Sequence, residues 1–231
     1  MTDIVSATDL HRRYGEGEAA VDALAGVTVG FPRGAYTAIM GASGSGKSTL
    51  MHCLAGLDTP TGGKVVIDGV ELGPLSDAKL TELRRDKVGF IFQAFNLLPV
   101  LTAEENLILP LTLAGTKPDR EWVQQLITTV GLGDRRTHRP AELSGGQQQR
   151  VAVARALVHK PAVVFADEPT GNLDSKSSAE VLNLLRRAVD DFGQTVVMVT
   201  HDPDAAAIAD RLIELEDGRI VRDEAVVAAS A

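Results

Sequence analysis

Short apolar runs alternate with amphipathic segments toward both ends of the chain. Runs of strand length occur at residues 35–40, 64–67, 88–92, 162–166, 195–200 and 212–216. Helix-like spacing of apolar positions is found at residues 47–57, 177–192 and 203–209. This alternation predicts an α/β fold with a mainly parallel core sheet that is covered by helices.

The middle of the chain has a different pattern. From residue 102 to about 130 the apolar spacing is helical, and Thr102 with Glu105 forms a capping-box signature. Pro118 and Asp119 are expected to start a second helix, and Gly131 to end it. Residues 94–158 are therefore predicted to form an all-helical insertion between two parts of the α/β core.

Composition narrows the class of protein. The 231 residues carry a formal net charge of −8, which argues against nucleic acid as the main partner. Cys53 is the single cysteine, so an internal disulfide is impossible and a reducing compartment is expected. We interpret Cys53 as part of the core, because a free cysteine behaves as a small hydrophobic residue.

The sequence also bears on the location of the protein. Residues 1–10 include Asp3 and Asp9 and contain no apolar run, so no signal peptide is expected. No segment approaches the roughly 20 apolar residues of a membrane span. We expect a cytoplasmic protein, which would serve a membrane from its inner face through another chain.

A glycine-rich segment joins the strand at residues 35–40 to the helix that follows. It reads Gly41-Ala42-Ser43-Gly44-Ser45-Gly46-Lys47-Ser48-Thr49 and matches G-x-x-x-x-G-K-[ST]. In that pattern the backbone amides wrap the β-phosphate of ATP, Lys47 reaches the β and γ oxygens, and the Ser48 hydroxyl ligates Mg²⁺. A plain glycine-rich turn is the alternative.

Two acidic residues, Asp167 and Glu168, end the apolar run at residues 162–166. A carboxylate at the end of a buried strand is costly unless it serves a cation or a reaction. We expect Asp167 to hold the Mg²⁺ hydration shell and Glu168 to orient or deprotonate the attacking water. The alternative for this strand–Asp–Glu–Pro pattern is a helix cap or a turn.

The third motif is Leu143-Ser144-Gly145-Gly146-Gln147-Gln148-Gln149-Arg150. Ser144 and Gln147 form a second capping box at the start of a helix. Capping alone does not explain two consecutive glycines, which suggest a close approach to the backbone. A helix start also attracts anions, so we expect this site to face a phosphate that a second copy of the protein holds.

Taken in order, these motifs resemble the ATPase subunit of an ABC transporter, from Tyr14 to about Gly218. The resemblance implies an α/β P-loop NTPase core with a mainly parallel sheet, an N-terminal antiparallel β portion and a helical insertion. It implies one ABC ATPase domain over residues 1–231. The nucleotide-binding core would comprise about 1–93 and 159–231, and the helical subdomain about 94–158.

The same resemblance assigns four further residues. Tyr14 matches an adenine-stacking aromatic residue, Gln93 a glutamine that senses Mg²⁺ and links to the membrane partner, Asp174 a loop at the dimer interface, and His201 a histidine on the γ-phosphate. The alternatives are an ordinary exposed tyrosine, a polar residue leaving a strand, and a locally bonded histidine. The remaining histidines fit no ligand spacing and are interpreted as structural: His11, His52, His138 and His159.

The implied mechanism needs a pair of subunits. ATP would bind to residues 41–49 of one copy, and residues 144–147 of the other would close over its γ-phosphate. With one set of motifs per chain, a homodimer or a closely related partner is required. ATP binding would close the pair, hydrolysis would reopen it, and a membrane permease would use the motion.

The more detailed resemblance is to the lipoprotein-release and macrolide-export group, through residues 96–106 and 168–174. That group pairs with a permease of few membrane helices, which favours export or mechanical coupling. The alternatives are an ATPase for amino-acid or peptide uptake and a soluble ABC ATPase of DNA repair or translation. Residues 94–101 follow Gln93 and are candidate permease contacts, because they present the apolar side chains Phe95, Leu97, Leu98, Val100 and Leu101. A buried hydrophobic loop is the other interpretation.

Overall fold

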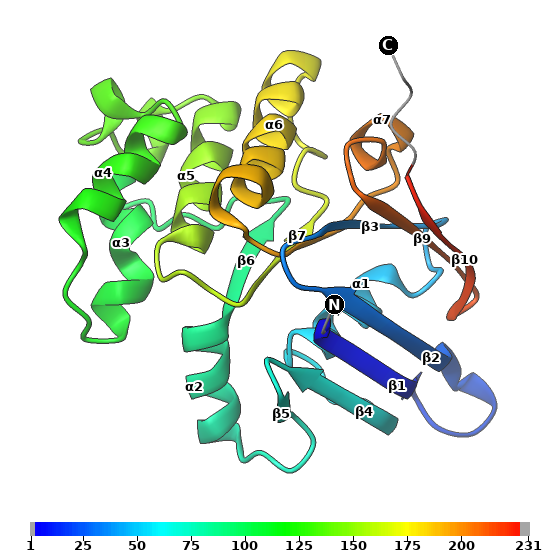
Figure 1. The fold of residues 1–231 in the computed structure, drawn as a ribbon. Helices are drawn as coiled ribbons and strands as arrows, with labels where there is room; N and C mark the ends of the chain where they lie inside the picture. Colours follow the sequence, from blue (N-terminus) through cyan, green and yellow to red (C-terminus); the bar gives the residue numbers. More distant parts are fainter. Residues whose placement is uncertain (1–2, 227–231) are drawn as a thin grey trace.

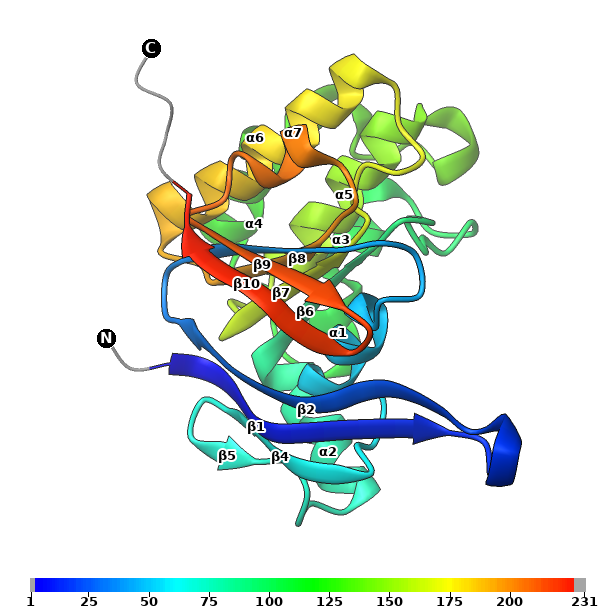
Figure 2. The same cartoon turned by 90° about the vertical axis from the view of Figure 1, so that its right-hand side faces the viewer.

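The computed structural model describes residues 3–226, and Figures 1 and 2 show it from two sides. The strands are β1 (Asp3–Tyr14), β2 (Val21–Pro32), β3 (Tyr36–Met40), β4 (Gly62–Ile67), β5 (Val70–Glu71), β6 (Val88–Phe92), β7 (Val163–Asp167), β8 (Val196–Val199), β9 (Arg211–Glu216) and β10 (Arg219–Ala225). The α-helices are α1 (Lys47–Leu54), α2 (Asp77–Lys87), α3 (Ala103–Leu113), α4 (Arg120–Thr129), α5 (Gly145–Leu157), α6 (Ser175–Phe192) and α7 (Pro203–Ala206). Short 3₁₀ turns are η1 (Gly17–Ala19), η2 (Gly133–Arg135) and η3 (Pro140–Glu142).

The strands form two sheets. The larger has the order β10-β9-β3-β8-β7-β6, in which β9, β3, β8, β7 and β6 are parallel and β10 is antiparallel. The smaller is antiparallel, with the order β2-β1-β4-β5. This arrangement confirms the predicted α/β fold with its mainly parallel sheet and N-terminal antiparallel portion.

The larger sheet is buried on both faces, which explains its continuous apolar strands. Successive residues of a strand point to opposite faces. In β8, Val196 and Met198 join a core cluster with helices α3 to α6, whereas Val197 and Val199 join a second cluster with α1 and the smaller sheet. Figure 2 shows the same division, with α5, α6 and α7 on one side of the sheet and β1, β2 and β4 on the other.

Several predicted boundaries shift. The helix expected at residues 47–57 ends at Leu54, because the chain turns at Gly56, whose φ is 66°. The helix expected at 177–192 begins at Ser175, where the Asp174 side chain caps it. Cys53 is buried as predicted, and burial raises the pKa of its thiol to about 12.

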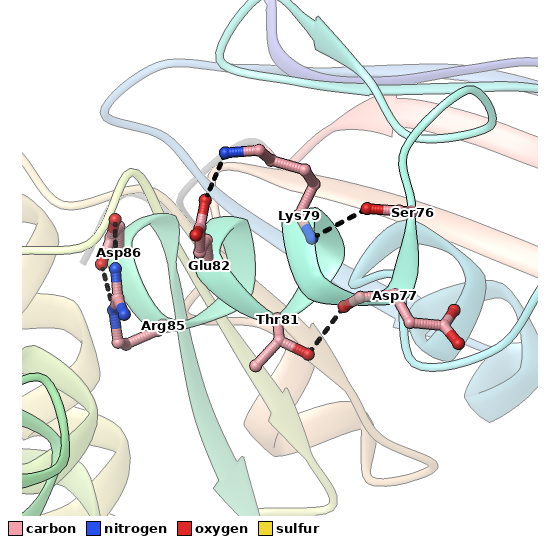
Figure 3. A network of polar contacts seen from close by, with 7 residues as sticks. All are labelled: Ser76, Asp77, Lys79, Thr81, Glu82, Arg85 and Asp86. Atoms are coloured by element: carbon pink, nitrogen blue, oxygen red, sulfur yellow. Dashed lines mark hydrogen bonds and ion pairs between the residues drawn. The ribbon is translucent and has the colours of Figure 1, made fainter.

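Helix α2 was not predicted, and it follows β5 and precedes β6 in the chain; Figure 3 shows its polar contacts. Leu83 is its one buried residue, so no apolar stripe marks it in the sequence. Polar groups define it instead: the Ser76 side chain accepts from the Lys79 backbone N–H, and Lys79 forms an ion pair with Glu82 at 2.8 Å. Its last turn is basic, as suits a helix C-terminus.

Candidate active site

The carboxyl ends of four parallel strands meet at one edge of the larger sheet. Phe92 of β6 pairs with Asp167 of β7, which in turn pairs with Val199 of β8, and Val199 pairs with Ile39 of β3. The residues that follow these positions therefore converge: Gln93, Glu168, His201 and the glycine-rich segment. In open α/β sheets this edge is where ligands bind.

A cavity of about 550 Å³ opens over the glycine-rich segment. Its lining consists of Ala23, Gly41, Ala42, Ser43, Gly44, Gly46, Lys47, Ser48, Thr49, Glu168 and His201. The structure thus brings the predicted phosphate loop together with two of the predicted catalytic residues. Ser45, the remaining predicted loop residue, is buried beside them, and its hydroxyl has no hydrogen-bond partner among the described residues.

The loop conformation depends on glycine at its end. Gly46 precedes α1 with a φ of 103°, and a side chain there would overlap the carbonyl oxygen of Ala23. Because Gly46 provides no capping side chain, the first N–H groups of α1 remain available for an anion. Lys47 is buried, and its ammonium donates to the carbonyls of Gly41 at 2.8 Å and Ala42 at 2.7 Å.

Ser48 and Asp167 place oxygen atoms at the mouth of the loop. The Ser48 hydroxyl donates to Oδ1 of Asp167 at 3.4 Å. Burial raises the pKa of the Asp167 carboxyl, and the Glu168 carboxylate adds to that rise. A cation would relieve both effects, and hydroxyl and carboxylate oxygens are the ligands that Mg²⁺ takes. This donor set fits the predicted ion.

Glu168 and His201 form a direct pair. Glu168 has a φ of 45°, in the left-handed region, and its carbonyl accepts from the Gly171 N–H at 3.0 Å. Its carboxylate lies 2.8 Å from Nδ1 of His201. This hydrogen bond raises the pKa of His201, whose side chain is 72% exposed. The strained turn after β7 thus directs the carboxylate toward the cavity and away from the sheet.

Gln93 follows the last residue of β6 and is held by Asn172, which no sequence motif identified as functional. Its side-chain nitrogen donates to Oδ1 of Asn172 at 3.1 Å, and Nδ2 of Asn172 donates to the Gln93 carbonyl at 3.1 Å. The Gln93 side chain also explains the glycine at position 171, because a Cβ there would lie 2.8 Å from Nε2 of Gln93. Gln93 and Asn172 are 79 residues apart, so no local sequence pattern predicts their contact.

The Ser144 motif begins α5 with a complete capping box. The Ser144 hydroxyl accepts from the Gln147 N–H, and Oε1 of Gln147 accepts from the Ser144 N–H at 2.9 Å. Gly146 has a cause within the chain, since a Cβ there would lie 2.7 Å from Oγ of Ser177 on α6. The close approach predicted from the two glycines therefore occurs, at Gly146, between α5 and α6 of the same chain. A Cβ at Gly145 would meet its neighbours, Leu173 and Phe95, at ordinary contact distances.

Several predicted site residues within residues 3–226 are absent from the cavity lining, among them Asp167, the last residue of β7, and Gln93, which follows β6. Residues 144–147 and Tyr14 are also absent from this lining in the described part of the chain. Tyr14 is 41% exposed, with the Arg12 guanidinium 4.4 Å from its ring centroid and its hydroxyl donating to Asp58 at 2.5 Å. Asp174 caps α6 by accepting from the Ser177 N–H at 3.0 Å, which lowers its pKa.

The other histidines have local contacts. His11 lies 3.0 Å from Asp9, His52 stacks at an angle on Phe90, His138 meets Arg135, and His159 meets the Val88 carbonyl. Within residues 3–226, no cluster of three or more His, Cys, Asp or Glu side chains has the arrangement of a metal centre. The same residues include no helix that is long and apolar enough to cross a membrane.

A P-loop at the carboxyl edge of a mainly parallel sheet, with a strand-end Asp and Glu beside it, defines a nucleoside-triphosphate-binding protein. The chain belongs to the ABC transporter family, whose model matches residues 24–171. It is an ATP-binding cassette and an ATPase, as the sequence predicted.

Two relatives differ in how much of their length this chain spans. It is 48% identical over 95% of its length to the macrolide export ATP-binding/permease protein MacB of Marinobacter nauticus, of which it spans only 34%. It is 47% identical to an ABC transporter ATP-binding protein of Thermotoga maritima that has not been characterised, covering 95% of this chain and 94% of that protein. The chain thus corresponds to about a third of the export protein and to nearly all of the separate cassette.

Among solved structures, a dimeric ATP-binding cassette in a post-hydrolysis state with bound ADP and phosphate superposes with a TM-score of 0.86. The two chains are 42% identical, and the match covers 96% of this chain and 99% of the other. ADP and phosphate are the products of ATP hydrolysis, so this neighbour shares both the fold and the reaction.

Proposed function

We propose that this ATPase pairs with a second copy of itself around two molecules of ATP and drives a membrane permease. The observation that carries the proposal is the separation within one chain of the phosphate loop from the Ser144 motif. The cavity over the loop is lined without residues 144–147. A capped helix start with exposed Ser144 at its tip is then available to the phosphate of another subunit.

In this proposal the residues at the carboxyl edge of the larger sheet have separate roles in hydrolysis. Residues 41–49, including the Lys47 ammonium, would bind the phosphates, and Ser48, Asp167 and the Gln93 amide would hold Mg²⁺ and its water. Glu168 orients or deprotonates the attacking water, while His201 contacts the γ-phosphate. Mg²⁺ supplies charge neutralisation on the phosphate oxygens. The hydrogen bond between Glu168 and His201 supports this assignment, because it joins the two groups at the mouth of the loop.

Two further residues complete the proposed site. Tyr14 would stack on adenine once its ring exchanges the Arg12 guanidinium for the base. Asp174 would lie near the subunit interface, where it fixes the start of α6. The single ABC ATPase domain would retain the predicted division into a nucleotide-binding core and a helical subdomain.

An apolar groove of about 480 Å³ is the proposed permease contact. It is lined by Ala55, Leu57, Thr81, Arg84, Arg85, Val88, Phe90, Phe92, Asn96, Leu109, Pro110, Leu113, Arg155, Ala156 and His159. Among the described residues, none that lines it is acidic, although the whole chain has a net charge of −8. The groove therefore suits an apolar segment that carries a carboxylate. Of the predicted contact residues 94–101, Asn96 lines the groove, and the end of α3 contributes Leu109, Pro110 and Leu113.

The similarity to proteins named for macrolide export favours export or mechanical coupling as the process that ATP hydrolysis drives. In those proteins an ATP-binding part and a permease part occur in one chain, and the present chain matches the ATP-binding third. A peripheral position on the inner face of the membrane follows from this partnership. Uptake is the second candidate, and the cargo would be decided by the permease.

The dimer is tested with Glu168→Gln, which keeps ATP bound by removing the proposed base. Light scattering during gel filtration should report a dimer with ATP and Mg²⁺ and a monomer with ADP. The control is Glu168→Gln combined with Lys47→Ala, which should remain a monomer in ATP. A Glu168→Gln protein that binds ATP yet stays monomeric would contradict the proposed pairing.

The groove is tested with Leu113→Glu, because Leu113 lines it and is 75% exposed. The matched control is Val221→Glu, an exposed residue on β10 at 55%. We expect Leu113→Glu to reduce the permease recovered with the protein from native membranes, with ATP-dependent dimerisation unchanged. Equal recovery with both variants would exclude the groove as the permease contact.

A further inference from the structure

Gln149 is a buried glutamine of α5 that the proposed mechanism does not use. Its exposed fraction is 0%. The side-chain nitrogen donates two hydrogen bonds, to the Phe92 carbonyl at 3.2 Å and to the Pro169 carbonyl at 2.5 Å. One amide of the helix that Ser144 caps therefore joins the ends of two neighbouring strands, β6 and β7.

The two carbonyls adjoin the residues to which catalysis is attributed. Phe92 immediately precedes Gln93, and Pro169 immediately follows Glu168. Because a peptide unit is planar, fixing the Phe92 carbonyl also fixes the plane that contains the Gln93 nitrogen. Fixing the Pro169 carbonyl in the same way restrains the turn that sets the left-handed conformation of Glu168.

A second side chain of α5 restrains the same loop further along. The Arg155 guanidinium donates to the Phe95 carbonyl at 2.9 Å and to the Asn96 carbonyl at 2.6 Å. Both of these residues have positive φ, 58° and 50°. The segment that contains Gln93 is thus attached to α5 on both sides, and to the turn after Glu168 through Asn172.

The acceptor atom of Gln149 has no hydrogen-bond partner among the described residues. A buried polar atom without a partner is destabilising. We conclude that the two hydrogen bonds donated by the Gln149 amide nitrogen offset the cost of burying its unpaired oxygen. An apolar side chain at this position has no donors and would leave both carbonyls without these hydrogen bonds.

We infer that Gln149 is a positioning residue for ATP hydrolysis. It ties Gln93 and Glu168 to the helix that begins at Ser144, so that seating of that helix start against a partner's phosphate orients both loops together. This inference rests on the proposed roles of Gln93 and Glu168. It adds a link between the Ser144 motif of a subunit and the catalytic residues of the same subunit.

The test compares Gln149→Met with Gln194→Met. Gln194 is also buried, and its side-chain nitrogen also donates to two carbonyls, of Pro161 at 3.1 Å and Thr195 at 3.2 Å. It precedes β8 and so lies at the opposite edge of the sheet. Each substitution removes two donors from two buried carbonyls, so both should lower the unfolding temperature by similar amounts.

We expect kcat of the Gln149→Met ATPase to fall on the order of tenfold or more, with less than about a twofold change in KM for ATP. Gln194→Met should retain the wild-type kcat. In Gln149→Met alone, amide hydrogen exchange of residues 93–97 and 168–173 should quicken. Gln149→Asn keeps the amide but shortens the side chain by one methylene, so it should also lower kcat. This variant replaces Gln149→Met in the test if the Met protein folds poorly.

The outcomes separate this inference from the proposed function. If Glu168→Gln abolishes turnover and Gln149→Met leaves kcat unchanged, or if both Met variants lower kcat equally, the positioning role is wrong. If Gln93→Ala and Glu168→Gln both retain wild-type turnover, the proposed catalytic roles themselves are wrong. A smaller effect of Gln149→Met in the Gln93→Ala background than in the wild type would support the link between the two residues.

Discussion

The two edges of the larger sheet differ in how completely their polar groups are hydrogen-bonded within the protein. At the amino edge, where β3 and β8 begin, side chains and backbone satisfy one another. Asp210 accepts from the Tyr36 N–H and from Arg186, each at 2.8 Å, and the Gln194 amide serves two carbonyls. At the carboxyl edge, the buried Ser45 hydroxyl and the Gln149 side-chain oxygen have no hydrogen-bond partner among the described residues, and the His201 side chain is 72% exposed.

This difference separates stability from function within one sheet. Groups that are satisfied inside the protein hold its elements together, and a ligand has little to offer them. The phosphate loop, Asp167 and Glu168 are arranged so that an anion and a cation improve their environment. Changes at the carboxyl edge should therefore affect turnover, and changes at the amino edge should affect stability.

The largest effect is expected from Glu168→Gln. Loss of the proposed base should lower kcat by at least about 100-fold, while ATP binding persists. Steady-state phosphate release and nucleotide binding measure the two properties. Glu216→Gln is the control, because Glu216 ends β9 at the same edge and is outside the cavity lining. A Glu168→Gln rate within about threefold of wild type would contradict the assignment.

The amino edge should respond in the opposite way to Trp122→Ala, because Trp122 lines a hollow with Ala162 and Thr195, which immediately precede β7 and β8. The Trp122 ring packs edge-on against Phe192 with centroids 5.1 Å apart, and its Nε1 donates to the Val158 carbonyl at 3.0 Å. We expect the free energy of unfolding to fall by about 2–3 kcal/mol, with ATPase activity per folded molecule unchanged. Trp122→Phe should cost about 1 kcal/mol. Denaturant titration measures both; a loss of kcat without a loss of stability would break the comparison.

Gly146→Ala tests the packing inferred between α5 and α6. Its Cβ would lie 2.7 Å from Oγ of Ser177, so we expect a loss of about 2 kcal/mol in the free energy of unfolding. Ser177→Gly in the same chain should recover part of that loss by providing room. Gly145→Ala is the matched control and should be close to neutral, because its nearest neighbour would lie at 3.5 Å. Equal effects of the two alanines would refute the packing argument.

The smallest effect concerns pH. The hydrogen bond from His201 to Glu168 raises the pKa of the histidine above its ordinary value. The paired, protonated form is therefore present at low pH and is lost as pH rises through this elevated pKa. Titration of the His201 ring by NMR should show the shift, and Glu168→Gln should reduce it. A His201 that titrates identically in both proteins would exclude the pair.

The sequence predicted what local patterns encode. Apolar runs located the buried strands, and both capping boxes form as expected at Thr102 and Ser144. Helix α2 was missed because Leu83 alone is buried in it, although Ser76 and its basic last turn were usable signals. The helix limits at residues 57 and 209 were placed too late, since α1 ends at Leu54 and α7 at Ala206.

The site was predicted where it is made of contiguous motifs and missed where it depends on tertiary contacts. Residues 41–49, Asp167 and Glu168 follow from motif and strand end. The contacts of Gln93 with Asn172 and of Gln149 with Phe92 join residues 79 and 57 positions apart. No periodicity indicates such pairs, because they depend on the parallel pairing of β6 with β7 and on the packing of α5 against β6.

The central claim, that each ATP site is completed by the other subunit, is tested most directly by mixing two inactive variants. Lys47→Ala removes the phosphate-loop cation, and Ser144→Asp keeps a good helix cap but opposes the partner's phosphate with a negative charge. Ser144→Asn is the uncharged control. If the sites are shared, ATPase activity will be absent from each variant alone and will appear in the mixture, whose mixed dimers contain one intact site. If the mixture stays as inactive as its components, the site lies within one chain and the account is wrong.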